Sequence, residues 1–298
     1  MAEDKPTGST VPRRQLGRFL RELRGQARFT IRRAALTLEW SEAKMWRIES
    51  GLTSLRSHDV ETMCRIYGAA PDLTEALMGL AKETKARGWW HAYGDVVPFG
   101  FDLYIGLEEA ASQLDWYEPE LVPGLFQTPE YARLIIQADN ASAPDDEIER
   151  RVNLRITRQA IITRATGAPV LRVIISEAVL RRQIGGPSLM ADQLRYIAEV
   201  GELPNVTIKV AAFAGGFHPG ILTGQFLTLR FPPYSGVGDE AEPPTVYVSG
   251  FTGDLYLDKP GEVQRYDAAF AQMWDLALDA EASREAITRM AGEYARHT

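Results

Sequence analysis

The stretch Thr30-Ile-Arg-Arg-Ala-Ala-Leu-Thr-Leu-Glu-Trp-Ser-Glu-Ala-Lys-Met-Trp-Arg-Ile-Glu-Ser-Gly51 predicts two short helices joined by a tight turn. Thr30 and Ser41 are suited to the N-cap position, because their hydroxyl oxygens can accept hydrogen bonds from the free N–H groups of a first helical turn. The small side chains of Ala34 and Ala35 allow the second helix to cross the first closely. Gly51 is expected to end the second helix, since glycine readily adopts the left-handed backbone found there. This arrangement is typical of a helix-turn-helix motif.

Apolar residues at helical spacing predict further helices on either side of this pair. They recur at i, i+3, i+4 and i+7, which places them on one face of a helix. They are Leu16, Phe19, Leu20 and Leu23 in a first helix and Val60, Met63, Cys64 and Tyr67 in a fourth. With a fifth helix predicted over residues 72–87, the chain is expected to begin with an all-α, five-helix helix-turn-helix domain. We place this DNA-binding domain at 13–70, after a flexible tail at 1–12 and before a helical connector at 71–94.

The net charge of the whole chain, −7, conceals an asymmetry between its two parts. Residues 1–70 hold 13 Lys and Arg against 8 Asp and Glu, a net charge of +5. Residues 71–298 hold 20 against 32, a net charge of −12. A basic domain can bind phosphates with release of counterions, whereas an acidic remainder needs a different partner. Double-stranded DNA is therefore the predicted partner of the first domain.

The composition favours a cytoplasmic protein with no membrane partner and no cofactor. A length of 298 residues with 45% hydrophobic content can form cores in two domains. The longest apolar runs fall short of the ~20 residues that cross a bilayer, and residues 1–11 are too polar for a signal peptide. The single cysteine, Cys64, cannot form an internal disulfide. The 4 histidines lack the spacing of a metal site.

The second helix of the motif is expected to enter the major groove of DNA with its first turn nearest the base edges. Base contacts are predicted for Ser41, Glu42, Ala43 and Lys44, with Trp46 one turn further along. Helix N-termini and guanidinium groups suit phosphate oxygens. Phosphate contacts are predicted for Thr30, Arg32, Arg33, Arg47 and Arg56. Two alternatives stay open: the arginines form only a solvated face, or Arg47 makes a salt bridge to Glu22 or Glu49.

Three segments of this region resemble the XRE (Cro/repressor-like) helix-turn-helix family. They are Leu16-Gly-Arg-Phe-Leu-Arg-Glu-Leu-Arg, then Thr30 to Ala35, then Trp40-Ser-Glu-Ala-Lys-Met-Trp-Arg-Ile-Glu-Ser-Gly51. The ending Arg47-Ile48-Glu49-x-Gly51 is the most specific of these features. The family usually has glycine in the turn, where this chain has Glu39, and often a polar residue after the first cap, where it has Ile31. These departures bear on the geometry of the turn rather than on the assignment.

The remainder, residues 95–298, is predicted to be an α+β domain with one mixed sheet. Runs rich in β-branched and aromatic residues predict strands. They cover 171–176, 206–211, 225–231 and 245–249. Helical patterns are predicted near 107–114, then over 145–163, 190–200, 262–280 and 283–294. Residues 116–131, rich in aromatic residues and proline, are expected to form a loop that enters a further helix.

Part of this loop, Val122-Pro-Gly-Leu-Phe-Gln-Thr-Pro-Glu-Tyr131, contributes to a second resemblance. Together with Arg158-Gln159, Gly224-Gln225-Phe226 and Tyr256-Leu257-Asp258, it resembles the effector domain of an actinobacterial group of antitoxin-like regulators. The resemblance covers nearly all of residues 95–298. It implies that the protein binds and neutralises a very small protein encoded nearby, as in a toxin–antitoxin pair. The acidic charge of this region is consistent with a basic partner.

Aromatic residues dominate binding grooves, which makes those of this loop candidates for contacts to the partner or to a ligand. The candidates are Trp116, Tyr117, Phe126, Gln127 and Tyr131. The alternative is that they pack the domain's own core. Catalysis is not predicted: the segment around His218 has no phosphate-binding signature, and no serine lies in a nucleophile motif.

Three hypotheses for the second domain follow: it binds a small protein, it binds a small molecule that gates DNA binding, or it is an enzyme. The first is preferred and the third is not supported. A homodimer is expected, because a single DNA-binding module buries only roughly 600–1,000 Å² and two half-sites multiply the affinity.

Overall fold

The computed structural model of the chain describes residues 10–85, 88–97, 101–232, 242–251 and 253–297. The chain divides into two compact units. Unit 1 comprises Met1–Ala92, Pro98–Ala110 and Pro232–Glu242, and unit 2 comprises Tyr93–Val97, Ala111–Phe231 and Pro243–Thr298. Of the predicted tail at 1–12, residues 1–9 lie outside the described residues, and the first helix begins at Thr10.

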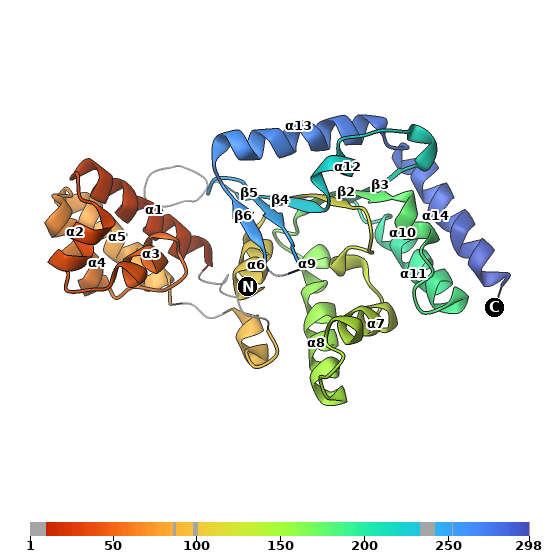
Figure 1. The fold of residues 1–298 in the computed structure, drawn as a ribbon, viewed down its shortest axis with the longest axis horizontal. Helices are drawn as coiled ribbons and strands as arrows, with labels where there is room; N and C mark the ends of the chain where they lie inside the picture. Colours follow the sequence, from red (N-terminus) through yellow and green to blue (C-terminus); the bar gives the residue numbers. More distant parts are fainter. Residues whose placement is uncertain (1–9, 86–87, 98–100, 233–241, 252, 298) are drawn as a thin grey trace. The chain divides into compact units, whose positions relative to one another are not determined.

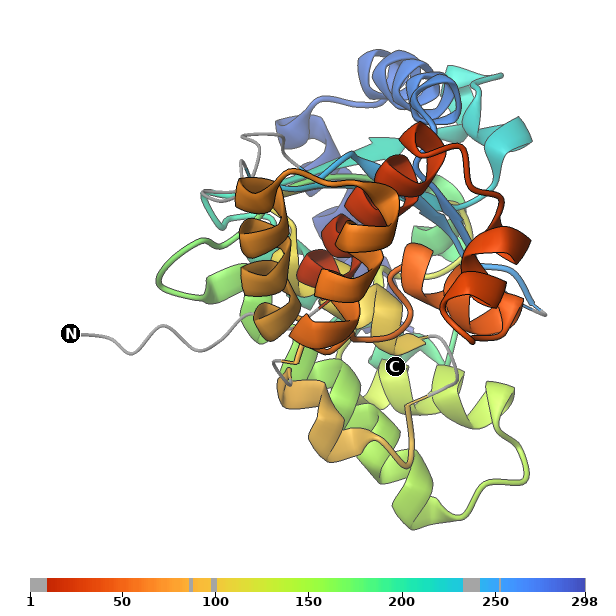
Figure 2. The same cartoon turned by 90° about the vertical axis from the view of Figure 1, so that its left-hand side faces the viewer.

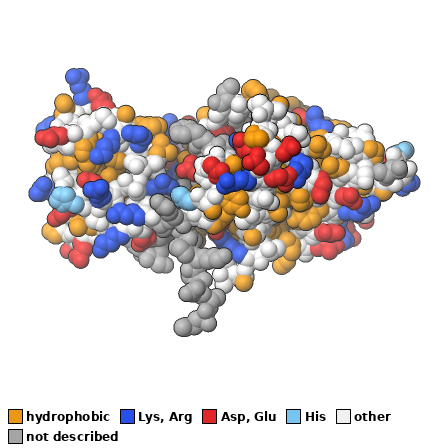
Figure 3. Space-filling model, turned by 90° about the horizontal axis from the view of Figure 1, so that it is seen from below, with side chains coloured by type: hydrophobic (Ala, Val, Ile, Leu, Met, Phe, Trp, Pro, Cys, Tyr) orange, Lys and Arg blue, Asp and Glu red, His pale blue; other side chains and the backbone are white. Residues whose placement is uncertain are grey.

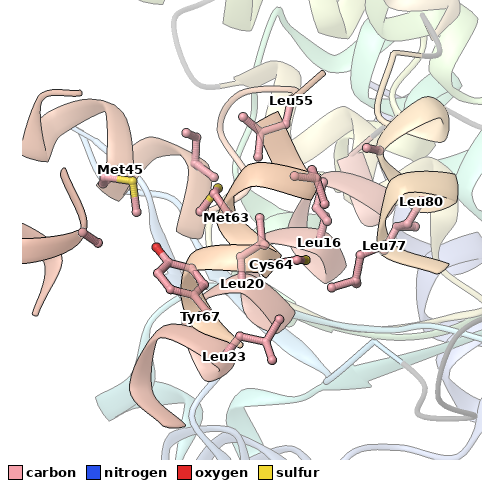
Figure 4. Packing of buried hydrophobic residues seen from close by; sticks show 14 of the residues in the cluster. Leu16, Leu20, Leu23, Met45, Leu55, Met63, Cys64, Tyr67, Leu77 and Leu80 are labelled. Atoms are coloured by element: carbon pink, nitrogen blue, oxygen red, sulfur yellow. The ribbon is translucent and has the colours of Figure 1, made fainter. Parts of the chain in front are cut away.

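The regular secondary structure in the described part of unit 1 is entirely helical, and unit 1 faces the viewer in Figure 2. Its helices are α1 (Thr10–Gln26), α2 (Ile31–Thr37), α3 (Glu42–Glu49), α4 (Ser57–Tyr67), α5 (Pro71–Glu83) and α6 (Phe101–Ala110), with the 3-10 turn η1 (Trp89–Tyr93) after α5. The apolar faces predicted for the first and fourth helices are buried, apart from Phe19, which is half-buried. Figure 4 shows side chains of α1, α3, α4 and α5 converging on one cluster, with Leu20, Met45, Met63 and Leu77 among its buried members.

Glycine allows α1 and α3 to pack closely. A Cβ atom on Gly17 of α1 would lie 2.6 Å from the carbonyl oxygen of Ile48 and 2.9 Å from that of Glu49. Such distances are too short for a carbon atom, so only glycine fits here. The crossing fixes α3 against the core of unit 1.

Unit 2 contains one mixed sheet. Its described strands are β1 (Gln113–Glu118), β2 (Val170–Ser176), β3 (Val206–Ala211), β4 (Phe226–Arg230), β5 (Thr245–Val248) and β6 (Leu255–Leu257), in the order β3-β2-β1-β4-β5-β6. β1 pairs in parallel with β2 and antiparallel with β4, so that Trp116 lies opposite both Val173 and Leu227. The predicted fold class, a helix-turn-helix domain followed by an α+β domain with one mixed sheet, is confirmed.

Helices lie on both faces of the sheet (Figure 1). They are α7 (Pro129–Asp139), α8 (Asp145–Arg158), α9 (Ala160–Thr163), α10 (Glu177–Arg181), α11 (Pro187–Val200), α12 (Gly220–Thr223), α13 (Pro260–Leu276) and α14 (Ala280–Ala295), with the short turns η2 (Gly124–Phe126) and η3 (Phe213–Gly215). α13 covers one face and buries Val263, Phe270 and Met273 against Tyr117 and Phe226 of the sheet. α7, α8 and α9 lie on the opposite side in Figure 1.

Two expectations about local structure were wrong. The helix predicted near 107–114 ends at Ala110, and the predicted loop from residue 116 begins as the central strand β1. β1 is buried on both faces, so its sequence lacks the polar–apolar alternation of a half-exposed strand. β6 was not predicted because it has only three residues.

In the described part of the chain, no helix combines the length and the apolar character that crossing a membrane requires.

Candidate nucleic-acid interface

Both helices of the motif begin at the predicted caps. The Thr30 hydroxyl accepts a hydrogen bond from the Arg33 N–H at 3.1 Å, and the Ser41 hydroxyl accepts one from the Lys44 N–H at 3.1 Å. Gly51, with φ of +71°, follows the end of α3 as expected. These contacts set the start and the end of α3, the helix predicted to read DNA.

The turn between the two helices contains a backbone conformation that side chains disfavour. Glu39 has φ of +56°, in the left-handed region. The Trp40 N–H donates to the Ala35 carbonyl at 2.8 Å and closes the turn. The turn therefore keeps the geometry that glycine would favour although glutamate occupies the position.

The outer face of α3 is open to solvent. Met45, Ile48 and Glu49 point into unit 1 and are buried. Of the ten residues predicted to contact DNA, nine are exposed and Lys44 is half-buried. Trp46 is the most unusual, because 55% of a large apolar side chain is exposed on this helix. The contacts of these ten residues with DNA remain predictions.

Two of the predicted DNA contacts lie against aromatic rings. The Lys44 ammonium lies 3.4 Å from the centre of the Trp40 ring, and the Arg33 guanidinium lies 4.2 Å from that of Phe29. Cation–π contacts of this kind hold a charged group in place while leaving it available to a ligand. Neither ring was predicted from the sequence as a partner of these cations.

Next to α3 lies a groove of about 670 Å³ whose charged lining residues are mostly basic. Lys44 and Arg47 of α3, Arg56 before α4 and Lys85 after α5 contribute positive charge, and Asp59 contributes the one negative charge of the lining. Arg47 and Arg56, predicted from sequence, thus share one surface. Lys85 was missed because it is far from the motif along the chain.

The open alternative for Arg47 concerned a salt bridge to Glu22 or Glu49. In the described residues Glu49 pairs with Arg24, at 2.6 Å, and no ion pair of Arg47 occurs. Arg14 and Arg18 of α1 pair with the buried carboxylate of Glu242. Some of the positive charge counted in residues 1–70 is therefore neutralised within unit 1, whereas Lys44, Arg47 and Arg56 beside α3 form no ion pair in the part of the chain that the structure describes.

In unit 2, the five candidates for partner contact are all buried. Tyr117 and Phe126 are at most 2% exposed, and Trp116 is 7% exposed. Gln127 donates to the Val122 carbonyl, and the Tyr131 hydroxyl accepts from the Val122 N–H. These side chains therefore form part of the core of unit 2 and hold the segment that follows β1. Their role in partner binding remains a prediction.

A buried carboxyl group lies at the end of β1. One Glu118 oxygen accepts a hydrogen bond from the Trp116 indole N–H at 3.1 Å, and the other is buried without a partner. Burial raises the pKa of Glu118 to about 8, and the Trp116 hydrogen bond opposes the shift. Burial lowers the pKa of His218, whose ring lies edge-on to Tyr117.

Charge differs between the two units on the face drawn in Figure 3. Lys and Arg side chains are scattered over unit 1, whereas Asp and Glu gather on unit 2. The first turn of α8 contains Asp145, Asp146 and Glu147. In the described residues, no three His, Cys, Asp or Glu side chains are placed to hold a metal ion.

Two families match different parts of the chain. Residues 101–289, more than half of its length, match the family described as a domain of unknown function, DUF5753. Residues 15–77 match the family described as a helix-turn-helix domain, which confirms that prediction. No curated protein and no solved structure matches the chain significantly.

Proposed function

The chain belongs to the DUF5753 family and carries a helix-turn-helix domain ahead of that domain. We propose that it is a sequence-specific transcriptional regulator of the XRE type. The observation that carries the proposal is the outer face of α3. This helix is capped by Ser41 and anchored through Met45, Ile48 and Glu49, and it exposes Glu42, Ala43, Trp46 and Arg47 beside a basic groove.

The residues divide by role along α3. Ser41, Glu42, Ala43 and Lys44 lie in the cap and first turn, where a recognition helix meets base edges. Lysine can donate to the guanine acceptors O6 and N7, and glutamate can accept from the cytosine amino group. Exposed Trp46 can contact a thymine methyl group.

The remaining residues suit phosphate contacts, which position a protein without reading sequence. Arg47 and Arg56 line the basic groove, and Arg32, Arg33 and Thr30 are exposed at the start of α2. Lys85 adds a further cation to the groove.

Selection of bound duplexes from a random DNA pool by the full chain tests this proposal. We expect recovery of a common motif, in two related half-sites if the regulator binds as a dimer. The control is the Lys44→Glu and Arg47→Glu double variant, which reverses the charge of the groove and should recover no motif. Equal recovery by both proteins, or no motif with the wild type, would contradict the proposal.

We extend the proposal to unit 2, which would bind a small basic protein encoded nearby. The net charge of −12 in residues 71–298 and the exposed carboxylates of Asp145 and Asp146 support a partner of opposite charge. Purification of the tagged full chain from its native cells at low salt, followed by mass spectrometry, tests this step. A stoichiometric small polypeptide released by about 0.5 M salt supports it. A retained metabolite in its place would favour gating by a small molecule.

A further inference from the structure

An exposed apolar surface lies beside the C-terminal half of α13. Its side chains are each half to four-fifths exposed: Phe213 59%, Phe217 66%, Ile221 61%, Leu222 78% and Leu276 50%. Together they are termed here the α12 patch. Figure 1 shows α12 and the preceding turn η3 running along α13.

The α12 patch is anchored from beneath. A Cβ atom on Gly220 would lie 2.5 Å from the Met273 sulfur and 2.6 Å from the Tyr117 ring, so α12 is pressed against the core of unit 2. The Leu278 N–H donates to the Val210 carbonyl at 3.0 Å, which ties the end of α13 to β3. The apolar side chains are therefore displayed on a well-packed base.

Four of the five side chains of the patch lie in a segment without charged residues, and the carboxylates of Glu177 and Asp275 lie at its edge, next to Phe213 and Leu276. Residues 210–229 contain no Asp, Glu, Lys or Arg, whereas residues 71–298 as a whole carry a net charge of −12. Two copies of such an acidic surface repel one another wherever carboxylates meet. Residues 210–229 can therefore face a copy of themselves with less repulsion than the acidic remainder of unit 2.

The area of the patch also fits a dimer. Five apolar side chains with these exposures offer on the order of 500 Å². A stable interface buries about 800 Å² per partner, of which about 65% is apolar in homodimers. The patch thus supplies about the apolar core that a symmetric dimer needs.

We propose that a second copy of this chain covers the α12 patch, forming an isologous dimer that carries two α3 helices to two half-sites. The proposal rests on the proposed function, since a regulator that reads two half-sites requires two DNA-binding units. In an isologous interface each copy contributes the same residues, and the proposal places Ile221 and Leu222 close to the twofold axis.

Sedimentation velocity of the full chain without DNA, over a range of concentrations, tests the proposal directly. We expect a dimer for the wild type and a rise of about 100-fold or more in the dimer dissociation constant for Leu222→Glu, because each interface then buries two carboxylates. Leu222→Met should retain the dimer. Val170→Glu introduces the same charge at an apolar residue that is 49% exposed outside the patch, and it should leave the dimer unchanged.

A cross-link provides a second readout that does not depend on destabilising the interface. Cys64 is buried, so the wild type has no exposed cysteine. Ile221→Cys should form a disulfide-linked dimer under mild oxidation, and Val170→Cys should not. A wild-type monomer, or a dimer that persists in Leu222→Glu without cross-linking by Ile221→Cys, overturns the assignment of this surface.

The two proposals fail in different ways. If the wild type is a monomer but selects a DNA motif, the dimer surface is wrong and the proposed function stands. If the wild type is a dimer through the patch but selects no motif, the proposed function is wrong. A Leu222→Glu variant that binds an isolated half-site as the wild type does, but loses at least about 10-fold in affinity for the paired sites, supports both.

Discussion

Arg24 on α1 holds the carboxylate of Glu49 at the end of α3 with two parallel hydrogen bonds, of 2.6 and 2.8 Å. The same guanidinium donates to the Phe29 carbonyl at 2.7 Å, in the loop before α2. The pairing explains why a glutamate follows Ile48 in the motif, since it fixes α3 to α1 rather than facing DNA.

Loss of one member of this pair should destabilise unit 1. The two side chains are only 13% and 4% exposed, so Glu49→Ala leaves a buried guanidinium without its main partner. We expect a loss of roughly 3–5 kcal/mol in the free energy of unfolding of unit 1. Hydrogen exchange of the amides in α1 and α3, together with urea denaturation, measures it. The control Glu42→Ala removes an exposed carboxylate from α3, and an equal loss in both variants would refute the role of the pair.

Replacing Glu39 in the turn with glycine, the residue that the XRE family usually has there, should stabilise unit 1. A side chain in the left-handed region costs about 1–2 kcal/mol, and glycine avoids this cost. Glu39→Gly is therefore expected to stabilise unit 1 by about 1 kcal/mol in urea denaturation. Glu39→Ala removes the same carboxylate but keeps a Cβ atom, so it should give a clearly smaller gain. Equal effects of the two variants would mean that the charge, not the backbone, determines the result.

Two glycines of α1 should respond to alanine in opposite directions. Gly17→Ala places a Cβ atom against the backbone carbonyl of Ile48, and we expect a loss of about 1–3 kcal/mol as α1 and α3 separate. Gly25→Ala meets nothing within 4 Å and should gain up to about 1 kcal/mol from helix propensity. Thermal unfolding of both variants measures the contrast. A stabilised Gly17→Ala variant would contradict the close crossing.

Substitutions of Lys44 and of Arg33 should affect DNA binding in different ways. Lys44 lies in the first turn of α3, and its loss in Lys44→Ala should relax base preference by roughly 1–3 kcal/mol. Arg33, at the start of α2, is proposed to contact phosphate. Arg33→Ala should weaken binding to all sequences alike and lower the salt slope by about one. Titrations of matched and mismatched duplexes at several salt concentrations test both expectations, and an unchanged affinity in both variants would refute the docking geometry.

The helix-turn-helix could be predicted almost residue by residue because its signals are local. The caps Thr30 and Ser41, the small residues Ala34 and Ala35 and the stop at Gly51 act within a few residues of their own position. The ion pair between Arg24 and Glu49 could not be predicted in the same way, because it depends on how two helices cross.

In unit 2, a central strand could not be predicted from the sequence. β1 escaped prediction because it is central and buried on both faces, so Trp116 and Tyr117 were interpreted as residues of a binding loop. Large aromatic residues serve cores and binding surfaces equally well, and the sequence of one chain does not distinguish them. Of the α12 patch, only Phe217 lies within residues 215–220, a segment whose glycines raised only the question of phosphate binding.

The stability of unit 2 should decrease as pH rises through neutrality because of Glu118. Its pKa of about 8 in the folded protein exceeds the ordinary 4.5, so the folded state binds this proton more tightly than the unfolded state does. Its contribution is therefore fully present below pH 4.5 and is lost as pH rises towards 8, by up to about 1.4 kcal/mol per pH unit.

Glu118→Gln imitates the protonated carboxyl at every pH. Urea denaturation at pH 5, 6, 7 and 8 should give similar stabilities for both proteins at pH 5 and a more stable variant at pH 8. The control Glu120→Gln changes an exposed carboxylate two residues further on, and it should keep the pH dependence of the wild type. Parallel curves for wild type and Glu118→Gln would show that the buried carboxyl is ionised throughout, and that an unseen partner in unit 2 stabilises its charge.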